Sequence, residues 1–252
     1  MNTIASENGY SILEVLISAA LGVIVLAGAF DVYISSTKSI MGQANIVQMQ
    51  ADTKAAMDNM VAELRMAYTG STGTTLASAI IDSGTITFYR VQESGYATSG
   101  TTTTLTDTGK SWAVNKFAST AAGTYFLFIK TGAGSGQVSP ATILNNYTST
   151  TLTLASALAT APSSIPPPGS LYFIVQQKTF TLLGDMTVRS LITGGSKYHL
   201  LARNVTLLQF NQGSPCTDTS VCITLSARSK DRDPRTKQYR TYSLTSSATP
   251  RN

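Results

Sequence analysis

The carboxylate of Glu14 lies inside the otherwise uncharged hydrophobic run of residues 10–30. An ionisable side chain in lipid costs roughly 2.5–3.5 kcal/mol even on insertion-derived scales. Either this segment does not sit in lipid, or Glu14 has a partner there. As an α-helix with a rise of about 1.5 Å per residue, the run would be about 30 Å long, which is enough to cross the hydrocarbon core of a bilayer.

Two interpretations of this segment leave Glu14 without a role. A cleaved secretory signal would use the small residues of LAGAF, at 27–29, as its cleavage site. However, the first eight residues contain no Lys or Arg and Glu14 interrupts the apolar region, and both features are atypical of such a signal. A plain membrane anchor accommodates the length of the run but gives no reason for the carboxylate.

The residues GYSILE at 9–14 resemble the class III leader motif of type IV prepilins. The resemblance implies that a prepilin peptidase cleaves between Gly9 and Tyr10, so that residues 1–9 form a leader that is removed. It also implies that Tyr10 becomes the N-methylated first residue of the mature chain and that Glu14 becomes the fifth. Tyr10 stands where the family usually has phenylalanine, and the leader lacks the family's usual basic residue.

Cleavage of this kind would supply a partner for Glu14. The free α-amine of Tyr10 would be positively charged near neutral pH. In a filament of staggered helices, the carboxylate of one subunit can pair with the amine of a neighbour or with its own. In a low-dielectric bundle such pairing offsets desolvation only in the correct register. Glu14 is therefore the predicted assembly salt bridge.

The two cysteines of the chain, Cys216 and Cys222, lie close together in CTDTSVC. In a chain with an N-terminal membrane or export segment, they most simply form one disulfide that closes a short loop. A reduced pair in a cytosolic protein is the alternative.

The remaining candidate residues assemble no catalytic, cofactor or metal site, so an enzyme is not predicted. His199 is expected to be a packed or half-exposed strand residue. Asp231 and Asp233 have the spacing of loop carboxylates that bind a hard cation, but neighbouring basic residues favour a solvated turn. Contact with DNA phosphates is a minor alternative for this turn. Its basic residues are Arg228, Lys230, Arg232, Arg235, Lys237 and Arg240.

One long helix is the first element that positions these residues. Apolar residues continue at helical spacing after residue 30, and no proline interrupts residues 10–68. The sequence predicts a helix over 10–68, transmembrane over 10–30, with its second half packed under a globular head. Its charged residues, Glu63 among them, are expected on the opposite face. The glycines of TGSTGTT at 69–75 are expected to end the helix.

Residues 69–252 are predicted to form an antiparallel β-rich head, which gives an α+β protein. TITFYRV at 85–91 has the alternating β-branched and aromatic residues of a strand. A strand or a short helix followed by a strand is expected within 197–212, a strand over 221–229, and a terminal strand with a tail within 240–252. CTDTSVC is expected in a hairpin loop between the first two. Residues 97–175 resemble a small β module of phage tail and bacterial surface proteins, which implies an all-β insertion in the head.

The composition suits an extracytoplasmic β-rich protein, because only 12% of residues are charged and the middle of the chain is rich in Thr, Ser and Gly. The net charge of +5 permits contact with anionic partners without requiring it. The C-terminal part, with LARNVTLLQF, VCITLSARSKD and a final Arg-Asn, resembles PilW-like minor pilins and J-type minor pseudopilins.

Together the resemblances imply a structural subunit of a type IV pilus, a minor pilin that primes or caps assembly or presents the insertion. The implied partners are other pilin subunits, the prepilin peptidase, the inner-membrane assembly platform and membrane lipid. The implied location is the bacterial inner membrane with the head in the periplasm, and later the extracellular filament. Two alternatives stay open: a minor pseudopilin of a type II secretion system, and a membrane-anchored adhesin or binding protein that does not polymerise.

Overall fold

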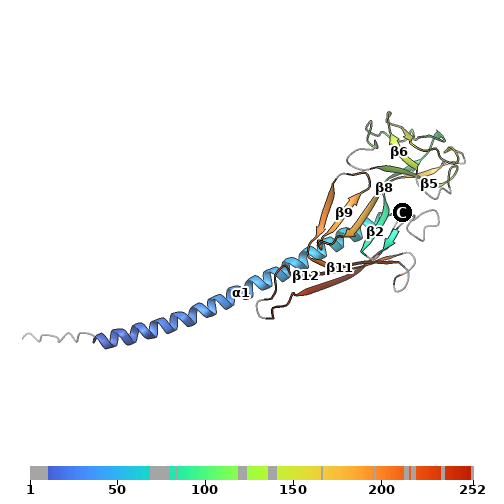
Figure 1. Cartoon of the computed structure of the whole chain (residues 1–252). Coiled ribbons are helices and arrows are strands. Elements are labelled where there is room, and N and C mark those ends of the chain that lie inside the picture. Colours follow the sequence, from blue (N-terminus) through green and yellow to red (C-terminus); the bar gives the residue numbers. More distant parts are fainter. Residues whose placement is uncertain are drawn as a thin grey trace, which may run out of the picture.

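The chain folds into one long N-terminal helix and a C-terminal domain of antiparallel strands (Figure 1). The α+β class predicted from the sequence is therefore confirmed. This computed structural model describes residues 11–68, 80–82, 84–118, 124–135, 141–165, 167–195, 197–212, 216, 220–233 and 236–250.

Helix α1 (Ile12–Arg65) runs for 54 residues without a break. Ser11 caps its start, since its side-chain oxygen accepts a hydrogen bond from the backbone N–H of Leu13 at 3.3 Å. The helix ends at Arg65, which corrects the predicted end at residue 68. The glycines of residues 69–75, which the sequence predicts to end the helix, lie outside the described residues. The backbone leaves the helix because it pairs with a strand: Ala67 bridges Arg90, and the N–H of Tyr68 donates to the carbonyl of Tyr89.

The strands of the head all pair in antiparallel fashion. In chain order they are β1 (Ile80–Asp82), β2 (Thr85–Tyr96), β3 (Ser99–Thr101), β4 (Thr104–Thr106), β5 (Tyr125–Thr131), β6 (Ala141–Asn145), β7 (Thr151–Leu154), β8 (Leu171–Leu182), β9 (Val188–Ile192), β10 (Tyr198–Ala202), β11 (Val205–Gln212), β12 (Val221–Arg228) and β13 (Thr241–Ala248).

Two long strands, β2 and β8, form the spine of the head and connect its two ends. They pair with each other along their whole length, from Thr85 opposite Thr181 to Tyr96 opposite Leu171. The first half of β8 also pairs with β5, and its second half pairs with β9, which in turn pairs with β10. The larger sheet continues from β5 through β6, β7 and β4 to β3, while β11, β12 and β13 form a separate sheet.

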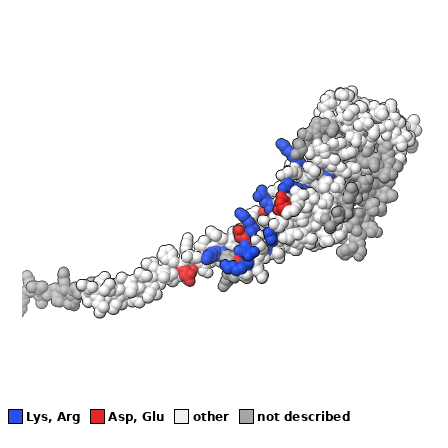
Figure 2. All heavy atoms as spheres, in the orientation of Figure 1, with Lys and Arg blue, Asp and Glu red and all other residues white. Residues whose placement is uncertain are grey.

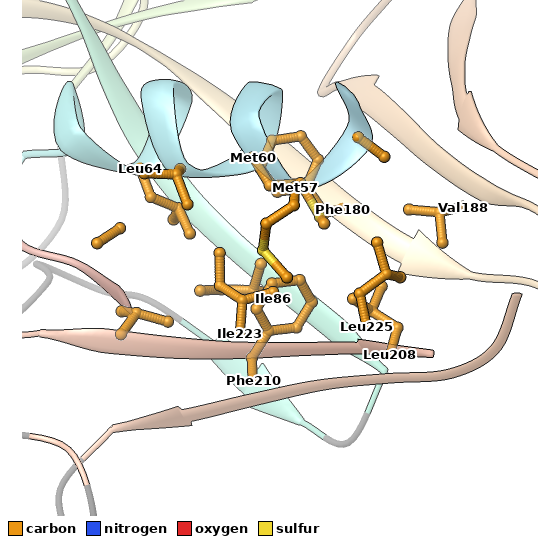
Figure 3. Packing of buried hydrophobic residues seen from close by; sticks show 14 of the residues in the cluster. Met57, Met60, Leu64, Ile86, Phe180, Val188, Leu208, Phe210, Ile223 and Leu225 are labelled. Carbon is orange, nitrogen blue, oxygen red and sulfur yellow. The ribbon is translucent and has the colours of Figure 1, made fainter. Parts of the chain in front are cut away.

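The core next to the helix lies between α1 and the two sheets (Figure 3). Met57, Met60 and Leu64 project from one face of α1 at the three- and four-residue spacing of a helix, and the last two are fully buried. They pack against Phe180 of β8, and the cluster continues to Phe210 of β11 and to β12. The second half of α1 is therefore part of the head, as predicted.

A second core lies among β3 to β8, in the stretch where an all-β insertion is predicted. Leu105, Trp112, Phe117, Leu127 and Tyr172 belong to it, and Trp112 packs edge-to-face on Phe117 with ring centroids 5.5 Å apart. Since Tyr172 is a residue of β8, the spine strand supplies side chains to both cores.

Candidate functional site

The N-terminal half of α1 carries a large apolar surface that the head does not cover (Figure 1). Every side chain from Ser11 to Ser36 is exposed, including Ile12, Val25 and Phe30. Among the described residues, α1 is the one helix long and apolar enough to cross a membrane, judged by length and composition. An exposed apolar surface of this extent marks a membrane or protein contact.

Glu14 lies in the first turn of α1, three residues after the capping Ser11. The spacing Ser-x-x-Glu is that of a capping box, and an acidic side chain near a helix N-terminus is favourable with the helix dipole. This spacing is visible in the sequence, but in the described structure no hydrogen bond joins the Glu14 carboxylate to the Ser11 backbone, and the Ser11 side-chain oxygen accepts from the backbone N–H of Leu13 instead of that of Glu14. Within the described part of the chain no side chain is bonded to the Glu14 carboxylate. Gly9 and Tyr10, the predicted cleavage site and partner, lie outside the described residues.

Charged side chains gather where α1 enters the head (Figure 2). After Glu14 the next charged residues along the chain are Asp31 and Lys38. The apolar surface therefore gives way to a charged surface within about two helical turns.

A groove of about 490 Å³ lies in this charged region, between α1 and the turn that joins β12 to β13. One wall is formed by α1 residues spaced three and four apart, which places them on one helix face: Ser35, Lys38, Ser39 and Gly42. The other wall includes Asp231, Arg232, Asp233 and Arg240. A hydrogen bond from the amide of Asn45 to Asp231, at 3.2 Å, joins the two walls.

Arginine pairs hold the turn itself. Asp233 accepts two hydrogen bonds from the guanidinium of Arg240, at 2.9 and 2.6 Å. The guanidinium groups of Arg228 and Arg232 lie over the ring of Tyr239, at 4.3 and 5.4 Å from its centre. In the described residues no group of three or more His, Cys, Asp or Glu side chains is placed to hold a metal ion. Arg235 of the predicted basic turn lies outside them.

Two cations of the groove differ from Arg240. Neither the ammonium of Lys38 nor the guanidinium of Arg232 has an ion-pair partner among the residues that the structure places. Both side chains are exposed. The groove therefore offers two cations without an ion-pair partner in the described part of the chain, beside the exposed carboxylate of Asp231 and close to the apolar surface of α1.

Glu63 anchors the other end of α1 to the spine of the head. Its carboxylate lies 2.9 Å from Nε of Arg90 on β2 and 3.0 Å from Nζ of Lys178 on β8. The Arg90 contact is an ion pair without hydrogen-bond geometry. The Glu63 side chain is only 16% exposed, so its predicted place on the solvent-facing side is wrong.

The insertion holds a polar cluster whose described groups are joined by hydrogen bonds and one ion pair. The Tyr172 hydroxyl donates to Asp107 at 2.6 Å, and burial together with this bond raises the pKa of Tyr172. Glu93 accepts a hydrogen bond from the indole N–H of Trp112 at 2.7 Å and forms an ion pair with Lys116. Burial alone would raise the pKa of Glu93, but Lys116 and Trp112 outweigh it and hold that pKa below its ordinary value.

Gly95 makes room for this cluster. A Cβ atom at Gly95 would collide with the carboxylate of Asp107 and the hydroxyl of Tyr172. A glycine is therefore required where β2 passes the buried pair. The cluster has the features of an internal support and not of a binding site, because its groups bond one another.

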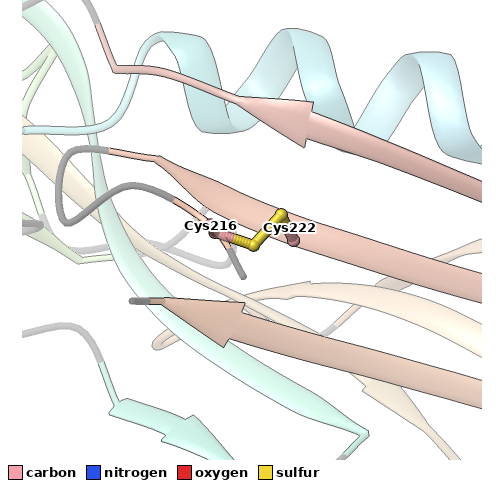
Figure 4. The surroundings of a disulfide bond; sticks show 2 residues. All are labelled: Cys216 and Cys222. Atoms are coloured by element: carbon pink, nitrogen blue, oxygen red, sulfur yellow. A yellow bond between two sulfur atoms is a disulfide. The ribbon is translucent and has the colours of Figure 1, made fainter. Parts of the chain in front are cut away.

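Cys216 and Cys222 form a disulfide, as predicted, with their Cα atoms 6.0 Å apart (Figure 4). Cys222 belongs to β12 and lies opposite Asn211 of β11, so the bond closes the end of this hairpin. His199 is an exposed residue of β10, opposite Ser190 of β9, and is more exposed than predicted.

Comparison of this chain with protein-family models, with curated proteins and with solved structures gave no match. The function is therefore inferred from the chain's own residues, chiefly from the apolar surface of α1 and the groove beside it.

Proposed function

We propose that this chain is a structural subunit of a type IV pilus, a minor pilin that primes or caps assembly or presents the insertion. One observation carries the proposal: α1 buries one face of its C-terminal half in the head and leaves its N-terminal half apolar and exposed on all sides. The leader motif at 9–14 immediately precedes this exposed half.

An apolar helix surface of this length needs a cover in both states that a pilin passes through. The stretch from Ile12 to Phe30 is 19 residues, or about 28 Å at 1.5 Å per residue, which suits the hydrocarbon core of a bilayer before assembly. In the filament, the same surface would pack against the helices of other subunits. The head would then face outward, with the insertion at its far end.

Glu14 would select the register of this packing. In a bundle of apolar helices its carboxylate is costly unless a cation lies beside it. Cleavage after Gly9 would place the α-amine of Tyr10 four residues away in the same chain and next to Glu14 of a staggered neighbour. The pairing stabilises one stagger of the helices over the others.

The first test is the N-terminus of the chain recovered from membranes. Mass spectrometry is expected to find a mature chain that begins with methylated Tyr10. A chain that keeps residues 1–9, or that begins at Phe30, would contradict the proposal.

The second test is incorporation into filaments. Glu14→Ala is expected to insert into the membrane and to be cleaved normally, while its amount in sheared filaments falls at least tenfold. Asp31→Ala removes the next acidic residue of the same helix and is the matched control, expected to assemble normally. Normal assembly of Glu14→Ala would favour a membrane-anchored binding protein that does not polymerise.

A further inference from the structure

We propose that the groove between α1 and the β12–β13 turn binds the headgroup of an anionic phospholipid of the membrane that α1 spans. The inference rests on the membrane span of the proposed function but does not require a filament. It assigns a role to Lys38 and Arg232 that neither the leader motif nor the head's core explains.

The helix wall of the groove begins close to the surface of the bilayer that α1 would span. If the apolar stretch that begins at Ile12 fills the hydrocarbon core, Asp31 lies at the edge of that core. The headgroup layer beyond this edge is roughly 5–8 Å thick on each side of a bilayer. Ser35 and Lys38 lie four and seven residues beyond Asp31, or about 6 and 10 Å along the axis. The end of the groove nearest the bilayer, at Ser35, is therefore level with the headgroups, and the backbone of Lys38 lies just beyond them.

The side chains of α1 that line the groove lean toward the bilayer. In an α-helix the Cα–Cβ bonds tilt toward the N-terminus, which for α1 is toward the bilayer. The long side chain of Lys38 can thus bring its ammonium group back to the level of the phosphates, as basic residues do near helix ends. Tyr33, an exposed aromatic residue between Asp31 and Lys38, suits the same interfacial layer.

The groove presents cations and hydrogen-bond donors that suit a phosphate group. Lys38 and Arg232 face the groove without an ion-pair partner in the described structure, although the guanidinium of Arg232 also lies over the ring of Tyr239. A phosphate would therefore meet two cations that no described carboxylate neutralises directly. The hydroxyls of Ser35 and Ser39 add neutral donors on the helix side. A guanidinium and an ammonium bind a phosphate through charge-assisted hydrogen bonds, which are the strong ones.

Asp231 opposes an anion in this groove, and this makes the proposal specific. Its carboxylate is exposed and is held by Asn45 alone among its described neighbours. Removing that charge is expected to strengthen headgroup binding, whereas a purely structural role of Asp231 predicts no gain. Asp233 differs, because Arg240 already neutralises it.

The experiment uses the full-length chain in nanodiscs of phosphatidylcholine with and without phosphatidylglycerol. The chain is transferred to mild detergent, and native mass spectrometry counts the lipids that stay bound. We expect phosphatidylglycerol to be retained over phosphatidylcholine. Lys38→Gln and Arg232→Gln are each expected to weaken that retention about fivefold, the value typical of one basic residue near an anionic surface. Asp231→Asn is expected to increase it.

Lys54→Gln is the matched control, since Lys54 is an exposed lysine of the same helix about 24 Å farther from the bilayer. Its retention of phosphatidylglycerol is expected to equal that of the unchanged chain. Circular dichroism and the thermal unfolding of every variant verify that the whole head is folded.

Equal retention by the Lys38 and Arg232 variants and the unchanged chain would overturn the proposal. Stronger binding of inorganic phosphate or of a DNA oligonucleotide than of phosphatidylglycerol, measured in the same detergent, would also overturn it. Extraction of the chain from membranes by alkaline carbonate would instead contradict the membrane span, and hence the proposed function. The two failures are thus distinguishable.

Discussion

Glu63 is the residue at which the helix and both spine strands meet. Its carboxylate faces Arg90 of β2 and Lys178 of β8, and the Lys178 side chain is only 11% exposed. Two cations so close to each other repel unless an anion lies between them. Glu63 therefore compensates a charge pair that the strands alone would not tolerate.

Replacing Glu63 by Gln is expected to lower the free energy of unfolding of the head by about 1–3 kcal/mol. The loss is smaller than for a fully buried ion pair because the three side chains are partly exposed. Chemical denaturation in mild detergent measures it. Asp58→Asn, at an exposed position of the same helix, is expected to have an effect below about 0.5 kcal/mol. Equal effects of the two changes would contradict the role given to Glu63.

Residue-level prediction from the sequence succeeded where the local pattern sufficed. Cys216 and Cys222 are close in sequence, so their pairing follows from a short hairpin loop, and the structure confirms it. Glu63 could not be assigned, because its partners lie 27 and 115 positions farther along the chain and helical spacing alone favoured the outer face. The groove was missed for the same reason: Asn45 and Asp231 meet only in the folded head.

At the scale of elements, the insertion depends on a polar cluster where β2 enters it and β8 leaves it. Glu93 of β2 holds Lys116 and the indole of Trp112, and Asp107 holds Tyr172 of β8. Each spine strand thus provides one polar side chain to the cluster, Glu93 from β2 and Tyr172 from β8. Trp112 is the only tryptophan of the chain, so its fluorescence reports on this region alone.

The stability of the insertion is expected to fall as the pH falls below about 4.3, the ordinary pKa of a glutamate. The pKa of Glu93 is lower in the folded chain, so its ionised form stabilises the fold. This contribution is complete above the ordinary pKa and is lost as the pH falls through the folded value. Denaturation followed by Trp112 fluorescence between pH 3 and 7 measures it. In Glu93→Gln this part of the pH dependence is expected to disappear, and its persistence would assign it to another group.

Prediction of the elements worked for those with a clear period. The strand at 85–91 and the unbroken apolar spacing of α1 are confirmed, although β2 continues to Tyr96 and α1 stops at Arg65. Both differences come from pairing: β8 extends β2, and the backbone of Ala67 and Tyr68 pairs with β2 instead of continuing the helix. Such pairings join residues distant in sequence, so no local pattern contains them.

The whole molecule consists of a covered half and an uncovered half of one helix. The head accounts for the burial of α1 only from Met49 onward. The stretch from Ile12 to Phe30 is apolar apart from Glu14, and a further charge placed within it would meet lipid if α1 spans the membrane. A single substitution can therefore test the span without touching the head.

Val25→Asp is expected to shift the chain from the membrane fraction to the soluble fraction. A charged residue at the centre of a membrane helix costs roughly 2.5–3.5 kcal/mol. Alkaline carbonate extraction followed by quantitative blotting measures the shift. Val47→Asp is the control, because Val47 is equally apolar and exposed on α1 but lies beyond the groove. If Val25→Asp stays in the membrane as fully as Val47→Asp, α1 does not cross lipid at Val25.

The spine of β2 and β8 also determines how the molecule bears tension. A pull on the insertion, resisted at α1, travels along the backbone of β2, because β2 is the long strand that leads back along the chain to α1. Any load that β8 bears reaches the helix through its hydrogen bonds to β2 and its other contacts in the head. At the lower end both strands reach the carboxylate of Glu63, through Arg90 and Lys178. The carboxylate of Glu63 thereby couples the helix to both strands at one point, so a pull on either strand also reaches the helix there.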